Sequence, residues 1–472
     1  MNSLTPFLPE LYGFLVIMIF FMRSLAKPNA GTNHALSWCL AGVGVAICLV
    51  TINQTADLFG STYRIDLFSQ VIKTLLFIGF FLVTLLCRNL TGIPDKRHAE
   101  FYLILATSTL AMMMLVSSVN LVTLYVTLEL SSYSLYILVY LRGGRQKGLE
   151  SSLKYFIIGA LSSAVTLFGF ACIYGATHTT HIFEWLQVLP ENTDNMVLLA
   201  GVILSLSGFL FKLAVFPFHF WAPDVYEGAA NQAAAFIATT SKVAAMAIIL
   251  RFVSAVPNTN SSMVSFLIVL SIASMTIGNL CAIAQKDLKR MLAFSSIAHA
   301  GYALIGISSM NPLGYASVVF YAAAFLAMKF TCFMVVVTVS TDGRNVEVQD
   351  LAGLHQRSPV LALALMLALF GLAGIPPTIG FSGKLMMFFS AMQAGRFYLV
   401  LIAMINVVVS LYYYLQILKA AYFLDPEQGH EILPLPGSLK VVSIFLIIVM
   451  VGGGLYPRLM IDLAVQAVLN LH

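Results

Sequence analysis

Six ionisable side chains stand inside long apolar stretches of this sequence, where a charge needs either a partner or a function. The acid is Glu129, in LVTLYVTLELSSYSLY, and the five bases are Lys73, Lys212, Lys242, Lys329 and Lys384. A charged side chain near the centre of a bilayer costs about 2.5–3.5 kcal/mol on insertion scales. Burial favours the neutral form of a lysine, whereas a nearby carboxylate favours the charged form. Lysines that share so few acids are able to gain and lose protons, and the pattern predicts a proton relay.

The six side chains differ in how well a purely structural role explains them. Lys73 lies only a few residues inside its apolar stretch, so a structural lysine that reaches toward the membrane surface is expected there. Glu10 also lies close to a membrane edge, and for Lys329 the structural and functional interpretations stay open. Lys242 lies about ten residues into its stretch, which places it near the bilayer midplane at roughly 1.5 Å per residue. We therefore predict Lys242 as the centre of the relay, with hydroxyls of Thr239, Thr240 and Ser241 close by in the sequence.

Two of the relay candidates flank positions where a helix must break. Residues 211–228 read FKLAVFPFHFWAPDVYEG, where Pro217 follows Lys212 by five residues. Residues 369–388 read LFGLAGIPPTIGFSGKLMMF, where Pro376 and Pro377 precede Lys384. Proline removes a backbone donor, and broken backbone at membrane depth is tolerated only where protein buries it or where it lines a wet cavity. Two such breaks in two halves of a chain indicate an inverted-repeat transporter, and two unrelated proline kinks are the simpler alternative.

The elements that must position these residues are membrane-spanning helices. Hydrophobic residues make up 60% of the 472 residues, charged residues only 10%, and the mean hydropathy is +0.91. Windows of about 20 apolar residues, long enough to cross the hydrocarbon core, recur along the whole chain. We predict an all-α polytopic membrane protein of about 14 transmembrane helices. The predicted spans are 5–22, 35–54, 68–87, 101–118, 121–140, 153–174, 196–222 (broken), 233–250, 262–284, 291–309, 314–338, 360–394 (broken), 398–421 and 440–460.

The positive charges outside the spans predict the orientation, because Lys and Arg are retained on the cytoplasmic side. One set of alternate loops holds only four: Arg64, Arg251, Arg396 and Arg458. The other set holds sixteen: Arg23, Lys27, Arg88, Lys96, Arg97, Arg142, Arg145, Lys147, Lys154, Lys286, Lys289, Arg290, Arg344, Arg357, Lys419 and Lys440. The second set is predicted to be cytoplasmic, with both termini on the periplasmic side. The net charge of +5 thus reflects topology, and no nucleic-acid partner is expected.

Metal and redox chemistry are not expected within this chain. The six cysteines lie within or at the ends of apolar spans and form no CxxC pair, which is typical of cysteines that act as small hydrophobic residues. The nine histidines are scattered, with no two at metal-ligand spacing inside one span. We predict no cofactor-binding and no metal-binding residues.

Four strings carry a resemblance to a known family: FKLAVFPFHFWAPDVYEGA, ATTSKVAAMAIILR, AQKDLKRMLAFSSIAHAGY and LAGIPPTIGFSGK. They resemble the antiporter-like membrane subunits of respiratory complex I, most closely the subunit N branch of bacterial NADH:quinone oxidoreductase, the counterpart of subunit 2. The resemblance is specific from about Phe101 to Tyr422. It implies one membrane domain over 1–472, with helices 1–3 in 1–100, inverted repeats of five helices in 101–254 and 262–421, and helix 14 in 438–472. Helices 7 and 12 are expected to be discontinuous.

The resemblance also implies roles for the ionisable residues. It places the family's ion pair on Glu129 and Lys212, its central lysine on Lys242, and its last relay residue on Lys384. A lysine at position 384 favours subunits N and L over subunit M, and the chain is too short for the lateral helix of subunit L. Lys329 departs from the family pattern, where a small or uncharged polar residue is usual. It is either an added relay member or the mark of a branch whose electron donor is not NADH.

The implied function is proton translocation coupled to quinone reduction, without a redox centre in this chain. FMN, iron–sulfur clusters and a quinone are expected on other subunits of the complex. Expected partners are a neighbouring antiporter-like subunit, small helical subunits and membrane lipid, in the bacterial cytoplasmic (inner) membrane. The alternatives are an Mrp-type cation/proton antiporter subunit and the membrane subunit of a related hydrogenase-type complex.

Overall fold

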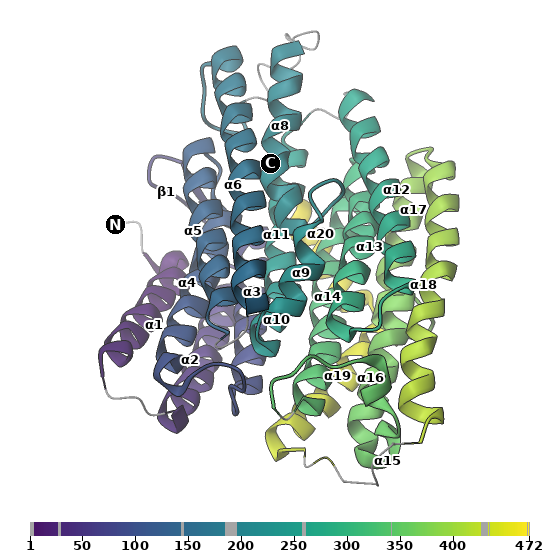
Figure 1. Cartoon of the computed structure of the whole chain (residues 1–472). Helices are drawn as coiled ribbons and strands as arrows, with labels where there is room; N and C mark the ends of the chain where they lie inside the picture. The colour runs from purple at the N-terminus through teal and green to yellow at the C-terminus, as the bar shows by residue number, and fades with distance from the viewer. Residues whose placement is uncertain are drawn as a thin grey trace.

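The chain folds into a bundle of long helices with one short hairpin, as the computed structural model shows (Figure 1). It describes residues 4–26, 30–142, 146–184, 196–256, 261–340, 342–425, 433, 435–469 and 471. Lys27 and Arg145, which enter the charge count, lie outside the described residues. The predicted all-α membrane fold is confirmed.

The first half contains the hairpin and, among its described residues, ten α-helices. The hairpin strands β1 (Ala56–Leu58) and β2 (Tyr63–Ile65) run antiparallel, with Asp57 opposite Arg64. Its helices are α1 (Leu8–Leu25), α2 (Ala30–Thr51), α3 (Leu67–Leu86), α4 (His98–Ser117), α5 (Leu121–Tyr140), α6 (Gln146–Thr177), α8 (Met196–Leu213), α9 (Trp221–Gly228), α10 (Asn231–Ala238) and α11 (Thr240–Ser254).

The second half continues the same bundle. Its helices are α12 (Ser261–Ile283), α13 (Leu288–Ser308), α14 (Pro312–Val339), α15 (Leu354–Arg357), α16 (Pro359–Ala373), α17 (Ile379–Gln393), α18 (Phe397–Phe423), α19 (Gly437–Leu455) and α20 (Arg458–Leu469). Short 3₁₀ turns lie at Thr5–Phe7, Asp95–Arg97 and Val348–Leu351.

Thirteen helices in the described ranges are long and apolar enough to cross a membrane. The predicted twelfth span is α16 and α17, of 15 residues each, with the Pro376–Pro377 break between them. Two predicted helices differ from expectation. The span predicted at 233–250 is interrupted at Thr239, and the final helix is divided into α19 and α20 because Pro457 cannot continue the helix.

Two of the helices that carry candidate lysines, α11 and α14, lie at the centre of the bundle. Neighbours cover 100% of the α10–α11 span, 94% of the α13 span and 83% of the α14 span, whereas only 28% of α2 and 22% of α19 is covered. The outer helices therefore present apolar side chains to lipid and shield the centre. Lys242 and Lys329 are carried by this shielded layer.

Candidate functional site

The first helix break has a left-handed residue at its start. α8 ends at Leu213, and Ala214 takes a positive φ of 61°. The Val215 amide then donates to the Leu210 carbonyl at 2.9 Å, which closes the helix with a Schellman-type bond. Pro217 lies in the turn that follows, before α9 begins at Trp221. The predicted break at Pro217 is confirmed.

The second break repeats this geometry. α16 ends at Ala373, Gly374 takes a positive φ of 85°, and the Ile375 amide donates to the Phe370 carbonyl at 2.9 Å. Pro376 and Pro377 occupy the turn, and α17 begins at Ile379. Both helices thus stop in the same way inside the bundle.

At each break a lysine binds the carbonyl end of the helix that has just stopped. Lys242 donates through Nζ to the Lys212 carbonyl at 3.0 Å, and Lys384 donates to the Leu372 carbonyl at 2.7 Å. The last carbonyls of a helix have no partner within the helix and carry partial negative charge. Each ammonium group therefore lies where a cation is favoured without a carboxylate.

Glu129 and Lys212 are close neighbours but make no direct ion pair within 4.0 Å. Lys212 Nζ donates to Ser131 Oγ at 2.8 Å, two residues beyond Glu129 on α5. The Glu129 carboxylate instead accepts a hydrogen bond from Ser163 on α6. The ion pair that the family resemblance implied is therefore replaced by two serine contacts, because each charged group has a nearer hydroxyl partner.

Lys242 lies at the start of α11, beside the interruption at Thr239. Its ammonium is 4.6 Å from the centroid of the Trp221 ring on α9, a cation–π contact. The buried hydroxyls of Thr240 and Ser241 have no hydrogen-bond partner among the described residues. Groups of this kind next to an ammonium are suited to accept or pass on a proton.

A chain of side-chain hydrogen bonds runs from Lys329 into the second half. Lys329 Nζ donates to Ser295 Oγ at 2.9 Å, and Ser295 Oγ lies 2.5 Å from Tyr414 Oη. Tyr414 Oη is 3.0 Å from His299 Nε2, and His299 Nδ1 contacts the hydroxyl of Tyr321. The series joins α14, α13 and α18 through groups that both donate and accept protons.

An aromatic ring separates this chain from the last lysine. Lys384 Nζ lies 4.3 Å from the Tyr302 ring centroid, and the rings of Tyr302 and His299 are 5.8 Å apart. Lys384 also borders an apolar cavity of about 580 Å³ between α17 and α18. Sequence reasoning missed His299, because the search for buried charges included only Lys, Arg, Asp and Glu. The spacing of Ser295, His299 and Tyr302 on one helix face could have revealed it.

Three relay lysines have only neutral partners in the part of the chain that the structure describes. Lys242, Lys329 and Lys384 are each at most 3% exposed, and none has a carboxylate within 4.0 Å. A buried charge without a counter-ion is costly. The arrangement can therefore hold a proton at each lysine without fixing it there by an ion pair.

Lys73 does not reach the membrane surface, so that prediction was wrong. Its side chain is 0% exposed and lies 2.5 Å from the Glu10 carboxylate, which is itself buried in the first turn of α1. Arg251, counted above as a loop charge, is buried in the last turn of α11 and pairs with Asp66 at 2.7 Å. Both basic side chains turn inward because an acid from another element is within reach there.

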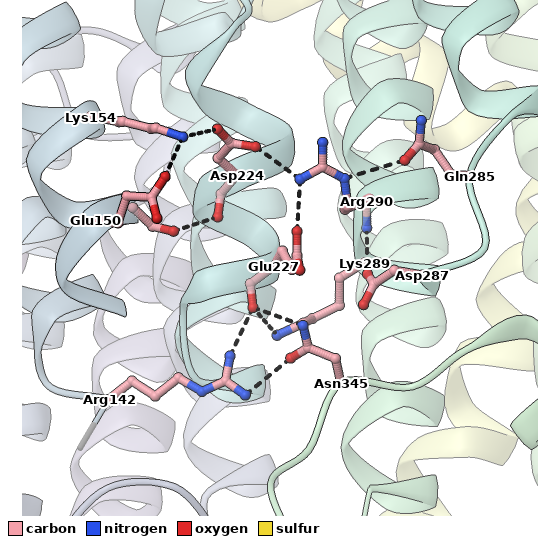
Figure 2. Close-up of polar contacts among 11 residues, drawn as sticks. Arg142, Glu150, Lys154, Asp224, Glu227, Gln285, Asp287, Lys289, Arg290 and Asn345 are labelled. Carbon is pink, nitrogen blue, oxygen red and sulfur yellow. Dashed lines mark hydrogen bonds and ion pairs between the residues drawn. The ribbon is translucent and has the colours of Figure 1, made fainter. Parts of the chain in front are cut away.

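A polar network fixes α9 at the end of the bundle where α5 ends and α13 begins. Figure 2 shows its side chains. Arg142 Nη1 donates to the carbonyls of Glu227 at 2.8 Å and Ala229 at 3.0 Å. Lys289 Nζ donates to the same two carbonyls at 3.1 and 3.0 Å. Two cations from different halves of the chain thus bind the carboxyl end of α9.

The same network continues through the side chains of α9. Arg290 pairs with Asp224 at 2.8 Å and Glu227 at 2.7 Å, and Lys154 pairs with Asp224 at 3.0 Å (Figure 2). Asp287 accepts from the Arg290 amide at 2.9 Å and caps α13. Burial raises the pKa of Asp287, although the Arg290 and Lys289 amides act in the opposite direction. α6, α9 and α13 are thereby tied together below the first break.

No group of three or more His, Cys, Asp and Glu side chains lies close enough to hold a metal ion within the described ranges. The buried polar side chains described above are proton donors and acceptors.

A family model described as NADH:quinone oxidoreductase/Mrp antiporter, TM, matches residues 118–410. NADH-quinone oxidoreductase subunit N 2 of Syntrophobacter fumaroxidans is 50% identical over 462 residues, which cover 98% of both chains. The protein of the same name from Opitutus terrae is 41% identical over 465 residues, covering 98% of this chain and 97% of that one.

Solved structures agree with these sequence relatives. A chain of respiratory complex I from Thermus thermophilus, with bound aureothin, has a TM-score of 0.85 and 31% identity, covering 97% of this chain and 99% of that chain. A chain of the Mrp complex from a Dietzia species has a TM-score of 0.87 at 20% identity, covering 99% and 98%. The latter likeness shows the fold alone.

Proposed function

This chain belongs to the transmembrane family of NADH:quinone oxidoreductase and Mrp antiporter subunits, on its subunit N branch, and from that premise we propose the route by which it moves protons. It is a proton-translocating membrane subunit of NADH:quinone oxidoreductase, or complex I. The 50% identity to a subunit N over nearly the whole length favours this function over an Mrp-type antiporter or a hydrogenase-type subunit.

The proposed route passes through Glu129, Lys212, Lys242, Lys329 and Lys384, with His299 as an intermediate. The observation that carries it is the hydrogen-bonded series Lys329–Ser295–Tyr414–His299. It runs from the lysine of α14 toward the second break, where the Tyr302 ring lies between His299 and Lys384. Histidine and buried carboxylates or lysines are the usual members of intramembrane proton relays. A histidine that contacts two tyrosine hydroxyls can accept a proton on one nitrogen and release one from the other.

Neutral partners make each transfer in this relay reversible. When Lys242 gives up its proton, the Lys212 carbonyl and the Trp221 ring lose a favourable contact, but no carboxylate is left unpaired. When the proton returns, the same two groups stabilise the ammonium again. Such a site changes charge at a smaller electrostatic cost than a lysine in a buried ion pair.

The two breaks support the proposal of two inverted repeats over 101–254 and 262–421. Each has a left-handed residue, a Schellman-type bond, a proline turn and a lysine on the preceding carbonyls. Lys242 comes from the span after the first break and Lys384 from the broken span itself, yet each binds the last carbonyls of a stopped helix, which fits a role for both in one path.

The protein is a multi-pass membrane subunit, and complex I implies further subunits. We place both termini on the periplasmic side of a bacterial cytoplasmic membrane because of the sixteen-to-four charge bias. FMN, iron–sulfur clusters and quinone then belong to other subunits, and a neighbouring antiporter-like subunit and small helical subunits adjoin this chain.

The test of the route is Lys242→Met in the intact complex. Methionine keeps the apolar stem and removes the titrating group, so assembly should persist while proton translocation falls by about 10²-fold or more, the range for loss of a positioned proton-transfer group. The measurement is proton uptake in membrane vesicles, alongside donor oxidation and complex content.

Lys242→Arg is the matched variant, because it keeps the positive charge but does not readily release a proton. It should pump as poorly as Lys242→Met. Wild-type pumping by Lys242→Met in assembled complex would show that the relay does not pass through this residue.

A further inference from the structure

Three buried groups that the relay does not use meet beneath the β1–β2 hairpin. Glu10 Oε1 accepts a hydrogen bond from Tyr63 Oη at 2.5 Å and lies 2.5 Å from Lys73 Nζ. Glu10 comes from the first turn of α1, Tyr63 from β2 and Lys73 from the second turn of α3. We call Glu10, Lys73 and Tyr63 the hairpin cluster.

A second ion pair adjoins the hairpin cluster. Asp66, the residue that caps α3, accepts from Arg251 Nη2 through both carboxylate oxygens at 2.7 Å. Arg251 and Lys242 both belong to α11, with Lys242 in its first turn and Arg251 in its last. At roughly 1.5 Å per residue along the helix, the two residues are about 14 Å apart. One buried helix therefore carries both the relay centre and the arginine of the ion pair beside the hairpin cluster.

The polar atoms here are incompletely satisfied by the described protein. Glu10 Oε2, Gln70 Oε1 and the Nε and Nη1 atoms of Arg251 are buried without a hydrogen-bond partner in the described ranges. An ion pair that served only to anchor α1 against α3 would have its remaining donors and acceptors paired, because unpaired buried polar atoms are destabilising. Unpaired atoms around a carboxylate are instead suited to proton exchange.

The position of the cluster favours exchange with water on one particular side. Glu10 is the third residue of α1, and Tyr63 belongs to a hairpin outside the spans. The hairpin cluster lies at the opposite end of the bundle from the Arg142–Lys289 network. α3 begins at the cluster's end with Leu67, and α11 ends there with Ser254. A short step therefore separates the Glu10 carboxylate from the solvent beyond the hairpin.

We propose that the hairpin cluster is a second proton-exchanging site, which loads and releases protons at the hairpin end of the bundle. The Lys73 ammonium gives a proton to the Glu10 carboxylate: its N–H bond breaks, an O–H bond forms, and the pair becomes neutral. Glu10 then releases that proton to water and regains its negative charge, and the Lys73 amine takes a proton from the Lys242 side. The inference rests on the proposed relay, which supplies that last proton.

The charge-neutral double variant Glu10→Gln/Lys73→Met separates this role from a structural one. It removes both charges together, so no buried ion is left without a partner. The assembled complex should persist, and proton uptake per electron in vesicles should fall by about tenfold or more. Assembly with wild-type pumping would overturn the proposal, because a structural pair has no further effect once both charges are gone.

Tyr63→Phe decides the matter if the double variant does not assemble. Phenylalanine keeps the ring that lies 5.4 Å from Lys73 Nζ but removes the hydroxyl that donates to Glu10. Reduced pumping with normal complex content supports the proposal, and unchanged pumping overturns it. Infrared difference spectra of the working complex give an independent reading, since the carboxylic-acid band of transiently protonated Glu10 should vanish in Glu10→Gln and persist in Glu10→Asp.

Two parallel variants complete the experiment. The control is Asp57→Asn/Arg64→Met, which neutralises a partly exposed pair of 3.3 Å in the same hairpin and should leave pumping unchanged. Lys242→Met distinguishes the two proposals. If Lys242→Met loses pumping while Glu10→Gln/Lys73→Met pumps normally, the role of the hairpin cluster is rejected and the relay stands. If Lys242→Met pumps at the wild-type level, the relay itself is rejected.

Discussion

At the scale of single residues, main-chain carbonyls take the place that carboxylates have in most buried lysine sites. Lys242 binds the Lys212 carbonyl, Lys329 binds the Leu292 carbonyl at 2.8 Å, and Lys384 binds the Leu372 carbonyl. A carbonyl orients an ammonium group without neutralising its charge. When the lysine loses its proton, no carboxylate is therefore left without a partner. This fits residues that must change protonation state in every cycle.

Two adjacent tyrosines test the residue-scale route. Tyr414 Oη contacts Ser295 and His299, whereas Tyr413 Oη donates to Asn279 Oδ1 at 3.0 Å. The Tyr413 ring packs 4.4 Å from the Tyr414 ring, a contact that phenylalanine keeps. Tyr414→Phe should reduce proton translocation by about tenfold or more, because a hydroxyl is removed from the path. Tyr413→Phe should leave translocation unchanged, although it also loses a buried hydrogen bond, which is worth about 1 kcal/mol.

The comparison uses proton uptake per electron in vesicles with equal complex content. Both side chains are buried and adjacent on α18, so nonspecific damage should affect them alike. Equal pumping by the two variants would remove Tyr414 and the His299 branch from the path.

The sequence predicted the relay lysines but only part of their surroundings. Lys212, Lys242 and Lys384 are conspicuous because charge is rare in apolar stretches, and the structure places them beside the two breaks. Whether they carry protons stays a prediction. The Glu10–Lys73 ion pair was not predicted, because its members are 63 residues apart in sequence and no local sequence pattern connects them. Long-range contact of this kind depends on how helices pack.

At the scale of elements, proline accompanies the breaks in the predicted seventh, twelfth and last helices, whereas the interruption at Thr239 has no such mark. Pro217, Pro376 and Pro377 each lie between the helices that they separate. Thr239 interrupts the α10–α11 span with φ −114° and ψ −79°, and its hydroxyl donates to the Ala235 carbonyl at 2.6 Å. Threonine hydroxyls bend helices by such bonds only in certain packing contexts. The run ATTSK is therefore compatible with an intact helix, and sequence alone could not locate this interruption.

Two glycines on α19 test how the second break is held. A Cβ at Gly454 would lie 2.0 Å from the Pro377 carbonyl oxygen, whereas a Cβ at Gly452 would meet nothing within 4 Å. Gly454→Ala must displace the backbone of the break and with it the carbonyls that bind Lys384. We expect less assembled complex and slower pumping. Gly452→Ala should be neutral or slightly stabilising, since alanine favours a helix over glycine by about 1 kcal/mol.

The readouts are complex content after detergent extraction and proton uptake in vesicles. The two variants add the same methyl group to the same helix, so they differ only in what that methyl meets. Normal assembly and pumping in Gly454→Ala would show that the break does not depend on close contact with α19.

At the scale of the whole molecule, the two ends of the bundle differ in charge. Basic side chains of Arg142, Lys154, Lys289 and Arg290 gather around α9 at one end (Figure 2). The β1–β2 hairpin lies at the other end, with Arg64 as its basic residue. Hydropathy and charge counts predicted the spans and this asymmetry, because both are summed over many residues and tolerate local error. The docking of α20 against α14 and α3 had no sequence signal, since it depends on tertiary packing.

Labelling of single cysteines from outside the cell tests the orientation of these two ends. Ser61 lies exposed in the β1–β2 turn, and Asp342 lies exposed after α14, at the end that carries the basic network. In a chain whose six native cysteines are replaced by alanine, Ser61→Cys should react with a membrane-impermeant maleimide in intact spheroplasts. Asp342→Cys should react only after the membrane is opened, because the positive-inside rule places the basic end in the cytoplasm.

A permeant maleimide should label both variants and so confirms that each thiol is accessible. Labelling of Asp342→Cys in sealed spheroplasts, with Ser61→Cys protected, would reverse the orientation, place the hairpin cluster at the cytoplasmic side and make it a proton-loading site.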